Sequence, residues 1–216
     1  MRSNVAYMAS PERLEKPGIH SFMGGWLHRP EKVKAAMLLS HGAGGNCENP
    51  LMVAVANAFC ESGFCVLRWD LPFRQSRPRG APGGSGERDR EGIRQAAQEL
   101  RQVAADVPLY LAGQSYGGRQ SSMVAAEDSS LADGLLLLSY PLHPPGKPAQ
   151  LRTEHFGSLR IPALFIHGTR DPFGTVDELR EAIKLIPVAA RLQVVEGAGH
   201  GVPPATAASM PAWLSA

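Results

Sequence analysis

A serine flanked by glycines lies near the middle of the chain, in the segment Gly-Gln-Ser-Tyr-Gly-Gly at 113–118. The apolar run at 108–112 before it predicts a strand, and the run at 116–127 predicts a helix. Glycines on both sides of a serine at such a junction permit a tight turn that exposes the hydroxyl at its tip. We therefore predict that Ser115 is a nucleophile. The alternative is a serine that only caps the following helix.

A histidine follows the last predicted strand, in the segment Glu-Gly-Ala-Gly-His-Gly at 196–201. A serine hydroxyl is a poor nucleophile at neutral pH and needs a base to remove its proton. The surrounding glycines let this loop bend back over the edge of the sheet, with the imidazole at its tip. Of the seven histidines in the chain, His200 is therefore the predicted general base, and the alternative is a histidine that serves only the turn.

An aspartate comes just after the penultimate predicted strand, in the segment Ile-His-Gly-Thr-Arg-Asp-Pro at 166–172. A carboxylate there would accept a hydrogen bond from one imidazole nitrogen and stabilise the cation that forms when the other nitrogen takes the serine proton. Asp171 is the predicted partner of His200. The alternative is an aspartate that only initiates a turn. Asp177 and Glu178 are replacements that look more like acids of a first helical turn.

Small residues follow the predicted strand at 35–40, in the segment Leu-Ser-His-Gly-Ala-Gly-Gly-Asn at 39–46. Acyl transfer needs donors aimed at the oxygen that becomes negative in the tetrahedral intermediate, and losing one donor costs about 3 kcal/mol. We assign this role to the backbone N–H groups of Ala43 and Tyr116. The predicted chemistry forms an acyl-enzyme on Ser115 that water then hydrolyses, and it needs no metal and no organic cofactor.

Short apolar runs alternate with longer amphipathic ones from Lys34 onward, which predicts a parallel sheet joined by crossover helices. The predicted strands lie at 35–40, 64–70, 108–112, 134–140, 163–167 and 191–196. The predicted helices lie at 51–62, 90–105, 116–127 and 176–186, and a terminal helix lies around 205–214. Two N-terminal segments, 4–9 and 19–28, could add edge strands. Because no repeat or linker divides the chain, residues 1–216 are expected to form a single domain.

A polar loop rich in arginine, proline and glycine is predicted from Leu71 to about Arg88, because too few apolar residues occur there to pack. Arg74 and Arg77 are candidates for contacts with a substrate carboxylate. Together with Arg79, Arg88 and Arg90, they could instead face an acidic partner, which would make the chain a binding protein that acts through its surface. Acidic residues at 87, 89 and 91 dilute the charge, so a solvated loop is the simplest interpretation.

Composition and charge bear on compartment and partners. The 216 residues are 44% apolar and 19% charged, with a net charge of +2. This net charge is too small to indicate a surface that binds nucleic acid. No apolar signal core or membrane-spanning run is present in the sequence, so a cytoplasmic protein without membrane contact is expected. The three cysteines lack metal or redox spacing and are expected to be reduced. Cys60 and Cys65 are expected to pack, and the thiol of Cys47 could be reached in its loop.

The His-Gly loop, the Gly-x-Ser-x-Gly turn and the chain order Ser115, Asp171, His200 together resemble the α/β-hydrolase superfamily from about Ala35 to the C-terminus. The resemblance implies an α/β fold with a mostly parallel central sheet, helices on both faces, and the catalytic residues at the C-terminal ends of the strands. Fewer than about thirty residues separate 140 from 163, too few for the helical cap of many members. The chain looks closest to the small cap-less branch that includes dienelactone-hydrolase-like proteins. Dienelactone hydrolase itself carries cysteine where this chain has Ser115, which argues against that reaction.

Two other functions compete with a serine hydrolase. Gly42, Gly44 and Asp70 also suit a dinucleotide-binding turn, although the third small position is Cys47 and the Ser115 motif would be left without a purpose. A related branch includes an α/β-hydrolase-like subunit of a chromatin acetyltransferase complex, so the fold can also serve as an interaction module. The favoured prediction is a hydrolase of a small ester or related acyl substrate. No feature of the sequence supports a protein partner.

Overall fold

The computed structural model contains one sheet of eight strands within the described residues, 10–14 and 25–215. Their spatial order is β1-β2-β4-β3-β5-β6-β7-β8. The parallel strands are β3 (Ala35–Ser40), β4 (Phe64–Trp69), β5 (Leu109–Gln114), β6 (Gly134–Leu138), β7 (Ala163–Gly168) and β8 (Ala190–Val195). Pairing is antiparallel where β2 (Gly25–His28) meets β1 (Glu12–Leu14) and β4. The predicted mostly parallel sheet is confirmed.

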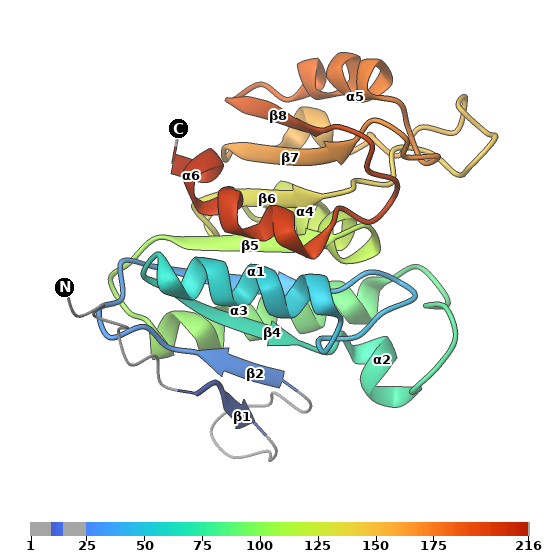
Figure 1. Ribbon diagram of the computed structural model, residues 1–216. Coiled ribbons are helices and arrows are strands. Elements are labelled where there is room, and N and C mark those ends of the chain that lie inside the picture. Colours follow the sequence, from blue (N-terminus) through green and yellow to red (C-terminus); the bar gives the residue numbers. More distant parts are fainter. Residues whose placement is uncertain (1–9, 15–24, 216) are drawn as a thin grey trace.

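Helices cover both faces of the sheet (Figure 1). One face carries α1 (Pro50–Glu61), the 3-10 turn η3 (Pro204–Ser209) and α6 (Met210–Ser215), and the other carries α3 (Glu87–Val103), α4 (Tyr116–Glu127) and α5 (Val176–Ala182). Side chains of β3 alternate between the two cores. Met37 and Leu39 join the cluster under α1, whereas Ala36 and Leu38 join the cluster under α3. A strand buried on both faces must be apolar throughout, which explains the unbroken apolar runs in the sequence.

The order of the strands reverses direction at β3. From β3 the chain continues into β4 on one side, and it later returns to place β5 on the other side. Loops that leave the C-terminal ends of β3 and β5 therefore diverge and leave a crevice between them. The small-residue loop at 41–46 and the predicted nucleophile both lie at this point.

The segment predicted as a loop contains a short helix, α2 (Pro72–Ser76). Proline fits the first turn of a helix, and the carboxylate of Asp89 accepts a hydrogen bond from the N–H of Phe73 at 2.8 Å. That acceptor comes from α3, so local composition does not reveal the helix. The helix α3 itself begins at Glu87 instead of Arg90.

The two ends of the chain also depart from the prediction. Part of the expected strand at 19–28 forms β2, which is not at the edge because the unpredicted β1 covers it. The strand expected at 4–9 lies outside the described residues. The expected terminal helix is divided into η3 and α6, because Pro211 has no N–H to continue a helix from 204.

Between β6 and β7 the chain forms one 3-10 turn, η1 (Phe156–Ser158). No helical cap of residues 139–162 therefore covers the C-terminal ends of the strands. None of the helices in the described part of the chain is both long and apolar enough to cross a bilayer.

Candidate active site

Ser115 lies at the junction of β5 and α4, in a backbone conformation that residues other than glycine rarely adopt. Its φ is 49° and its ψ is −114°, a strained combination that is typical of functional turns. A Cβ on Gly113 would lie 2.5 Å from the nitrogen of Gly118, and one on Gly117 would lie 2.5 Å from the carbonyl oxygen of His41. The side chain of Ser115 makes no capping hydrogen bond to α4. Its hydroxyl is therefore not used as a helix cap.

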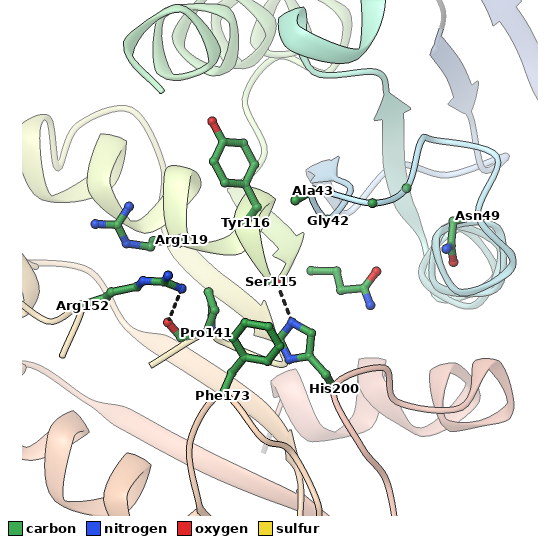
Figure 2. A pocket seen from close by; sticks show the side chains of 13 residues that line it. Gly42, Ala43, Asn49, Ser115, Tyr116, Arg119, Pro141, Arg152, Phe173 and His200 are labelled. Atoms are coloured by element: carbon green, nitrogen blue, oxygen red, sulfur yellow. Dashed lines mark hydrogen bonds between the residues drawn. The ribbon is translucent and has the colours of Figure 1, made fainter. Parts of the chain in front are cut away.

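The three residues predicted to act together are hydrogen-bonded in a row. The Oγ atom of Ser115 lies 2.7 Å from Nε2 of His200 (Figure 2). On the other side of the ring, Nδ1 of His200 lies 3.0 and 2.9 Å from the two oxygens of Asp171. A carboxylate facing Nδ1 favours the tautomer with hydrogen on Nδ1, which leaves Nε2 free to accept the serine proton.

Asp171 is held in its place by the loop that follows β7. Its side chain is fully buried, and its Oδ1 accepts a hydrogen bond from the N–H of Phe173 at 2.9 Å. The buried His167 lies next to it, with Nε2 2.7 Å from the carbonyl oxygen of Gly174. That carbonyl can only accept, so Nε2 of His167 carries the hydrogen and fixes the same loop.

The two replacement acids are occupied elsewhere. Glu178 forms a capping box with Thr175 at the start of α5, and Asp177 is exposed and pairs with Arg180. Neither is hydrogen-bonded to His200. The positions of both residues agree with their interpretation as first-turn helix acids.

Phe173 is a site residue that the sequence prediction missed. Its ring stacks on the imidazole of His200, with centroids 3.9 Å apart and planes inclined by 27°. Stacking restricts rotation of the imidazole, and aromatic contacts of this kind contribute about 0.5–1.5 kcal/mol. An aromatic residue two positions after the predicted acid was the available signal.

The loop after β3 passes close to the serine. A Cβ on Gly42 would lie 3.6 Å from the Cβ of Ser115, and Ala43 and Tyr116 both line the pocket that contains Ser115. Tyr116 is the first residue of α4, so its N–H has no acceptor within the helix. The structure thus places Ala43 and Tyr116, the two predicted oxyanion donors, beside the serine in the same pocket.

Polar contacts fix the beginning of this loop. The buried His41 accepts a hydrogen bond at Nε2 from the N–H of Leu71 at 3.1 Å, and its Nδ1 lies 2.8 Å from the carbonyl oxygen of Gly42. Burial lowers the pKa of His41, which favours the neutral ring that this pattern requires. The imidazole therefore joins the loop to the residue that precedes α2.

Arg74 and Arg77 do not line the pocket, contrary to the prediction that they contact substrate. Arg74 is buried, and its guanidinium donates to the carbonyl oxygens of Gly45 at 2.8 Å and Ala43 at 2.9 Å. Arg77 is exposed and donates to Ala81. A guanidinium whose donors are already used by backbone carbonyls cannot also bind a carboxylate. Arg74 instead fixes the peptide groups of the oxyanion loop.

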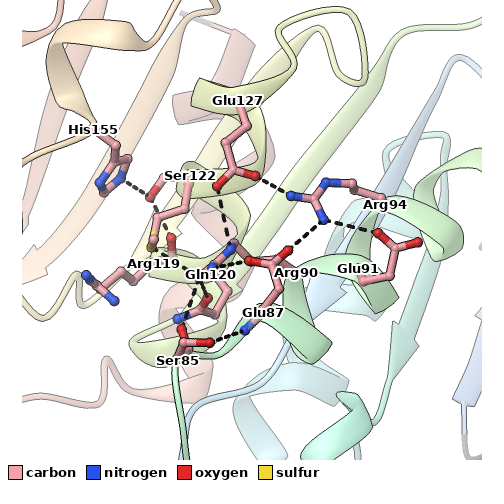
Figure 3. A network of polar contacts seen from close by, with 11 residues as sticks. Ser85, Glu87, Arg90, Glu91, Arg94, Arg119, Gln120, Ser122, Glu127 and His155 are labelled. Carbon is pink, nitrogen blue, oxygen red and sulfur yellow. Dashed lines mark hydrogen bonds and ion pairs between the residues drawn. The ribbon is translucent and has the colours of Figure 1, made fainter.

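A second arginine near this loop is also occupied internally. Arg90 is buried, and it contacts Gln120, the carbonyl oxygen of Ser85 and the carboxylates of Glu87 and Glu127 (Figure 3). With Arg74 and Arg90 both buried, the loop presents less charge to solvent than the sequence suggests. Arg74 and Arg90 are therefore not available to an arginine-rich docking surface.

The geometry also argues against a dinucleotide site at the end of β3. The carboxylate of Asp70 accepts a hydrogen bond from the N–H of Cys47 at 2.7 Å, so it closes the loop on itself. Cys47 is buried, and burial and the nearby Asp70 raise its pKa to about 12. Its thiol is therefore not accessible, which corrects that expectation. Within the described residues, no group of three or more His, Cys, Asp or Glu side chains is arranged to hold a metal ion.

The pocket around Ser115 has a volume of about 620 Å³. The Gly42–Gly45 loop and Asn49 form one side of it. Arg119 and Arg152, which the sequence prediction did not include, line it as well. Arg119 lies four positions after Ser115 on α4, a spacing that places two residues on the same helix face and that could have identified it.

Comparisons with known proteins agree with this architecture. The model of a family described as the alpha/beta hydrolase domain matches residues 33–210. TT1662 from Thermus thermophilus is 25% identical, with a TM-score of 0.73 over 95% of this chain and 96% of that chain. Dienelactone hydrolase from Anabaena variabilis is 18% identical, with a TM-score of 0.71 over 96% of each chain. XC6422 from Xanthomonas campestris, a serine hydrolase without a lid, is 21% identical, with a TM-score of 0.64 over 90% of this chain and 86% of that chain.

Proposed function

The chain belongs to the alpha/beta hydrolase family, and from this premise we propose that it is a serine hydrolase of a small ester or related acyl substrate. The observation that carries the proposal is the row of hydrogen bonds from Ser115 through His200 to the buried Asp171. A nucleophile within 2.7 Å of a base that is itself oriented by a carboxylate is the arrangement that activated serine requires.

In the acylation step, Oγ of Ser115 attacks the acyl carbon while its proton passes to Nε2 of His200. The carbonyl oxygen becomes negative and accepts hydrogen bonds from the N–H groups of Ala43 and Tyr116. The bond from the acyl carbon to the leaving oxygen then breaks, and His200 gives its proton to that oxygen. The alcohol leaves, and the acyl group stays on Ser115 as an ester.

In the deacylation step, a water molecule takes the place of the alcohol. His200 removes one of its protons as its oxygen attacks the acyl carbon, and the same two N–H groups bind the negative oxygen. The bond to Oγ of Ser115 breaks, and His200 returns the proton to it. Asp171 stays ionised throughout and stabilises the imidazolium in both steps.

The access to Ser115 and the size of the pocket indicate what kind of substrate fits. Because residues 139–162 form no helical cap over the strand ends, substrate reaches Ser115 directly, and the pocket of about 620 Å³ suits a small molecule. The similarity to the Xanthomonas campestris serine hydrolase without a lid supports the same conclusion.

A fluorophosphonate probe tests the proposal, because it reacts only with an activated serine. We expect the folded wild-type protein to gain the mass of one probe per chain and to hydrolyse 4-nitrophenyl acetate. Ser115→Ala abolishes both, whereas Ser130→Ala, which changes an exposed serine after α4, leaves both unchanged. A wild-type protein with a native circular dichroism spectrum that neither reacts with the probe nor hydrolyses the ester would contradict the proposal.

A further inference from the structure

Two arginines share one side of the pocket beside Ser115. Arg119 lies on α4, one turn after the serine, and Arg152 lies in the segment between β6 and β7. Figure 2 shows both side chains together on the side of Ser115 away from Gly42 and Ala43. A substrate whose carbonyl oxygen points to the oxyanion loop would therefore extend its other end toward the two guanidinium groups.

Neither guanidinium forms an ion pair with a carboxylate of residues 25–215. The Nε atom of Arg119 is buried and donates to no acceptor in this part of the chain. Arg152 donates through Nη1 to the carbonyl oxygen of Pro141, at a long 3.3 Å. Both arginines line the pocket. Because no carboxylate of these residues pairs with them, their terminal N–H groups are available to a molecule that enters the pocket.

The neighbouring arginines of α3 show what a structural role looks like in this protein. Arg90 and Arg94 lie next to α4 in the same region, and both are held by acidic side chains (Figure 3). Their partners are Glu87, Glu91 and Glu127. In Figure 3 no interaction joins the side chain of Arg119 to this network. The Nε atom of Arg90 also lacks a hydrogen-bond partner, so the difference lies in the ion pairs. Arg90 and Arg94 contact carboxylates, whereas Arg119 and Arg152 contact none within residues 25–215.

The surroundings of the pair set its net charge. Burial lowers the pKa of Arg152, and the positive charge of Arg119 lowers it further, so the two groups repel each other. Burial, and then Arg119, lower the pKa of His155 to about 4, so this neighbour is neutral at pH 7. The exposed Glu154 acts on Arg152 from outside. Two cations and one anion leave a net charge of +1, which matches a single carboxylate better than a doubly charged phosphate.

We infer that Arg119 and Arg152 form a carboxylate-binding subsite, and that the preferred substrates are esters that carry a free carboxylate a few carbon atoms from the reacting carbonyl. Half-esters of short dicarboxylic acids are the simplest such compounds. The inference rests on the proposed function of Ser115. A guanidinium binds a carboxylate through two parallel hydrogen bonds, so the anchored end fixes the distance of the ester carbonyl from Ser115.

A matched pair of esters measures the effect of the charge. The 4-nitrophenyl half-ester of adipic acid has a free carboxylate, and 4-nitrophenyl methyl adipate has the same chain without the charge. We expect kcat/KM of the wild type to be about 10- to 100-fold higher for the charged ester, the range of one hydrogen-bonded contact to a charged group. Arg119→Gln and Arg152→Gln should each bring this ratio close to one. Arg119→Lys should restore part of it, because it keeps the charge but not the planar fork.

Arg160→Gln is the control variant, because Arg160 follows η1, is exposed and, among the described residues, donates only to the backbone of Gly157 and Leu159. It should leave the ratio at its wild-type value. If the wild type hydrolyses both esters equally well, or if Arg119→Gln and Arg152→Gln keep the wild-type ratio, the subsite is refuted while the serine hydrolase stands.

Calorimetric titration of the Ser115→Ala protein tests the subsite without turnover. Monomethyl adipate should bind saturably and dimethyl adipate should not, and Arg119→Gln in the same background should abolish the binding. That result supports the subsite even if wild type hydrolyses no ester, which would refute the proposed function alone. Equal binding of both adipates overturns the subsite. The subsite is also overturned if inorganic phosphate binds more tightly than monomethyl adipate and loses this binding in Arg119→Gln, because the site would then select phosphate.

Discussion

Two sides of the same pocket are built in different ways. The relay side consists of Ser115, Asp171 and His200, which follow β5, β7 and β8 and contact one another directly. The loop side consists of residues 41–47 after β3, and side chains from distant elements hold its peptide groups. Its main support is the buried guanidinium of Arg74, which comes from α2. The relay side thus depends on the topology of the sheet, whereas the loop side depends on polar contacts across the chain.

The largest loss of activity is expected from a change on the relay side. In Asp171→Asn the amide can donate to Nδ1 of His200, which favours the tautomer that cannot accept the serine proton. We expect kcat to fall by about 10³- to 10⁴-fold with little change in the structure. Asp177→Asn, on the exposed surface of α5, should leave kcat unchanged. Steady-state kinetics with 4-nitrophenyl acetate measures both variants, and a loss of less than about tenfold in Asp171→Asn would contradict the proposed role of the acid.

A smaller loss is expected from a change on the loop side. Arg74→Gln removes the donors that hold the carbonyl groups of Ala43 and Gly45, so the adjacent N–H groups lose their fixed orientation. Deleting one oxyanion donor costs about 10²- to 10³-fold, and displacing it should lower kcat by about 10- to 100-fold. KM should change little, because the affected contact forms in the transition state.

Two further variants separate the geometry of the Arg74 guanidinium from the positive charge of this region. Arg77→Gln removes a nearby exposed arginine and should keep the wild-type kcat. Arg74→Lys should stay impaired, because one ammonium group cannot reproduce the planar fork of Arg74. If Arg74→Gln or Arg74→Lys retains full kcat at a temperature where the protein is folded, the loop side does not need this arginine.

The comparison also explains what the sequence could predict. Strands β3, β6 and β7 were predictable because they are buried on both faces and are almost wholly apolar. The edge strand β8 is only half-buried and includes Arg191 and Gln193. The meeting of Ser115, Asp171 and His200 follows from the same topology, since parallel strands end at one edge of the sheet. The strands, and the short motifs that carry these three residues, can each be recognised from neighbouring positions in the sequence.

The remaining features depend on residues far apart in the chain. The helix α2 begins where Asp89 accepts a hydrogen bond from Phe73, and Arg74 faces carbonyl groups about thirty residues earlier, a separation that local patterns do not encode. Local composition therefore suggested a solvated loop with arginines directed at substrate. Arg152 could not be assigned for the same reason, because the irregular segment between β6 and β7 has no periodicity.

A modest effect is expected from the aromatic ring that supports the relay side. Phe173→Leu keeps an apolar side chain but removes the stacked contact with His200, so the imidazole can rotate more freely. The contact is worth about 0.5–1.5 kcal/mol, which corresponds to a fall in kcat of about 2- to 10-fold. Phe173→Tyr keeps the ring and should keep most of the activity. Equal activity of Phe173→Leu and wild type would show that Asp171 alone orients the imidazole.

The smallest effect, absent at neutral pH, is expected in the stability of the loop side. The buried His28 accepts a hydrogen bond from Nε of Arg68 at 2.9 Å, and Nη1 of Arg68 donates to the carbonyl oxygen of Cys47 at 2.7 Å. Burial, and then the charge of Arg68, lower the pKa of His28 from 6.5 to about 4. His28 is therefore uncharged in the folded protein at any pH well above 4.

Between pH 6.5 and about 4 the unfolded chain binds a proton at residue 28 that the folded protein does not bind. Unfolding then takes up a proton, so the contribution of His28 to stability is complete above pH 6.5 and is lost as the pH falls through this window. In His28→Gln the amide oxygen can still accept from Arg68 but does not titrate. The loss of Tm between pH 7 and pH 5 should therefore be smaller in His28→Gln than in wild type, while both proteins should show the same change between pH 7 and pH 8. Equal losses down to pH 5 would mean that protonation of His28 does not weaken the support of the loop through Arg68.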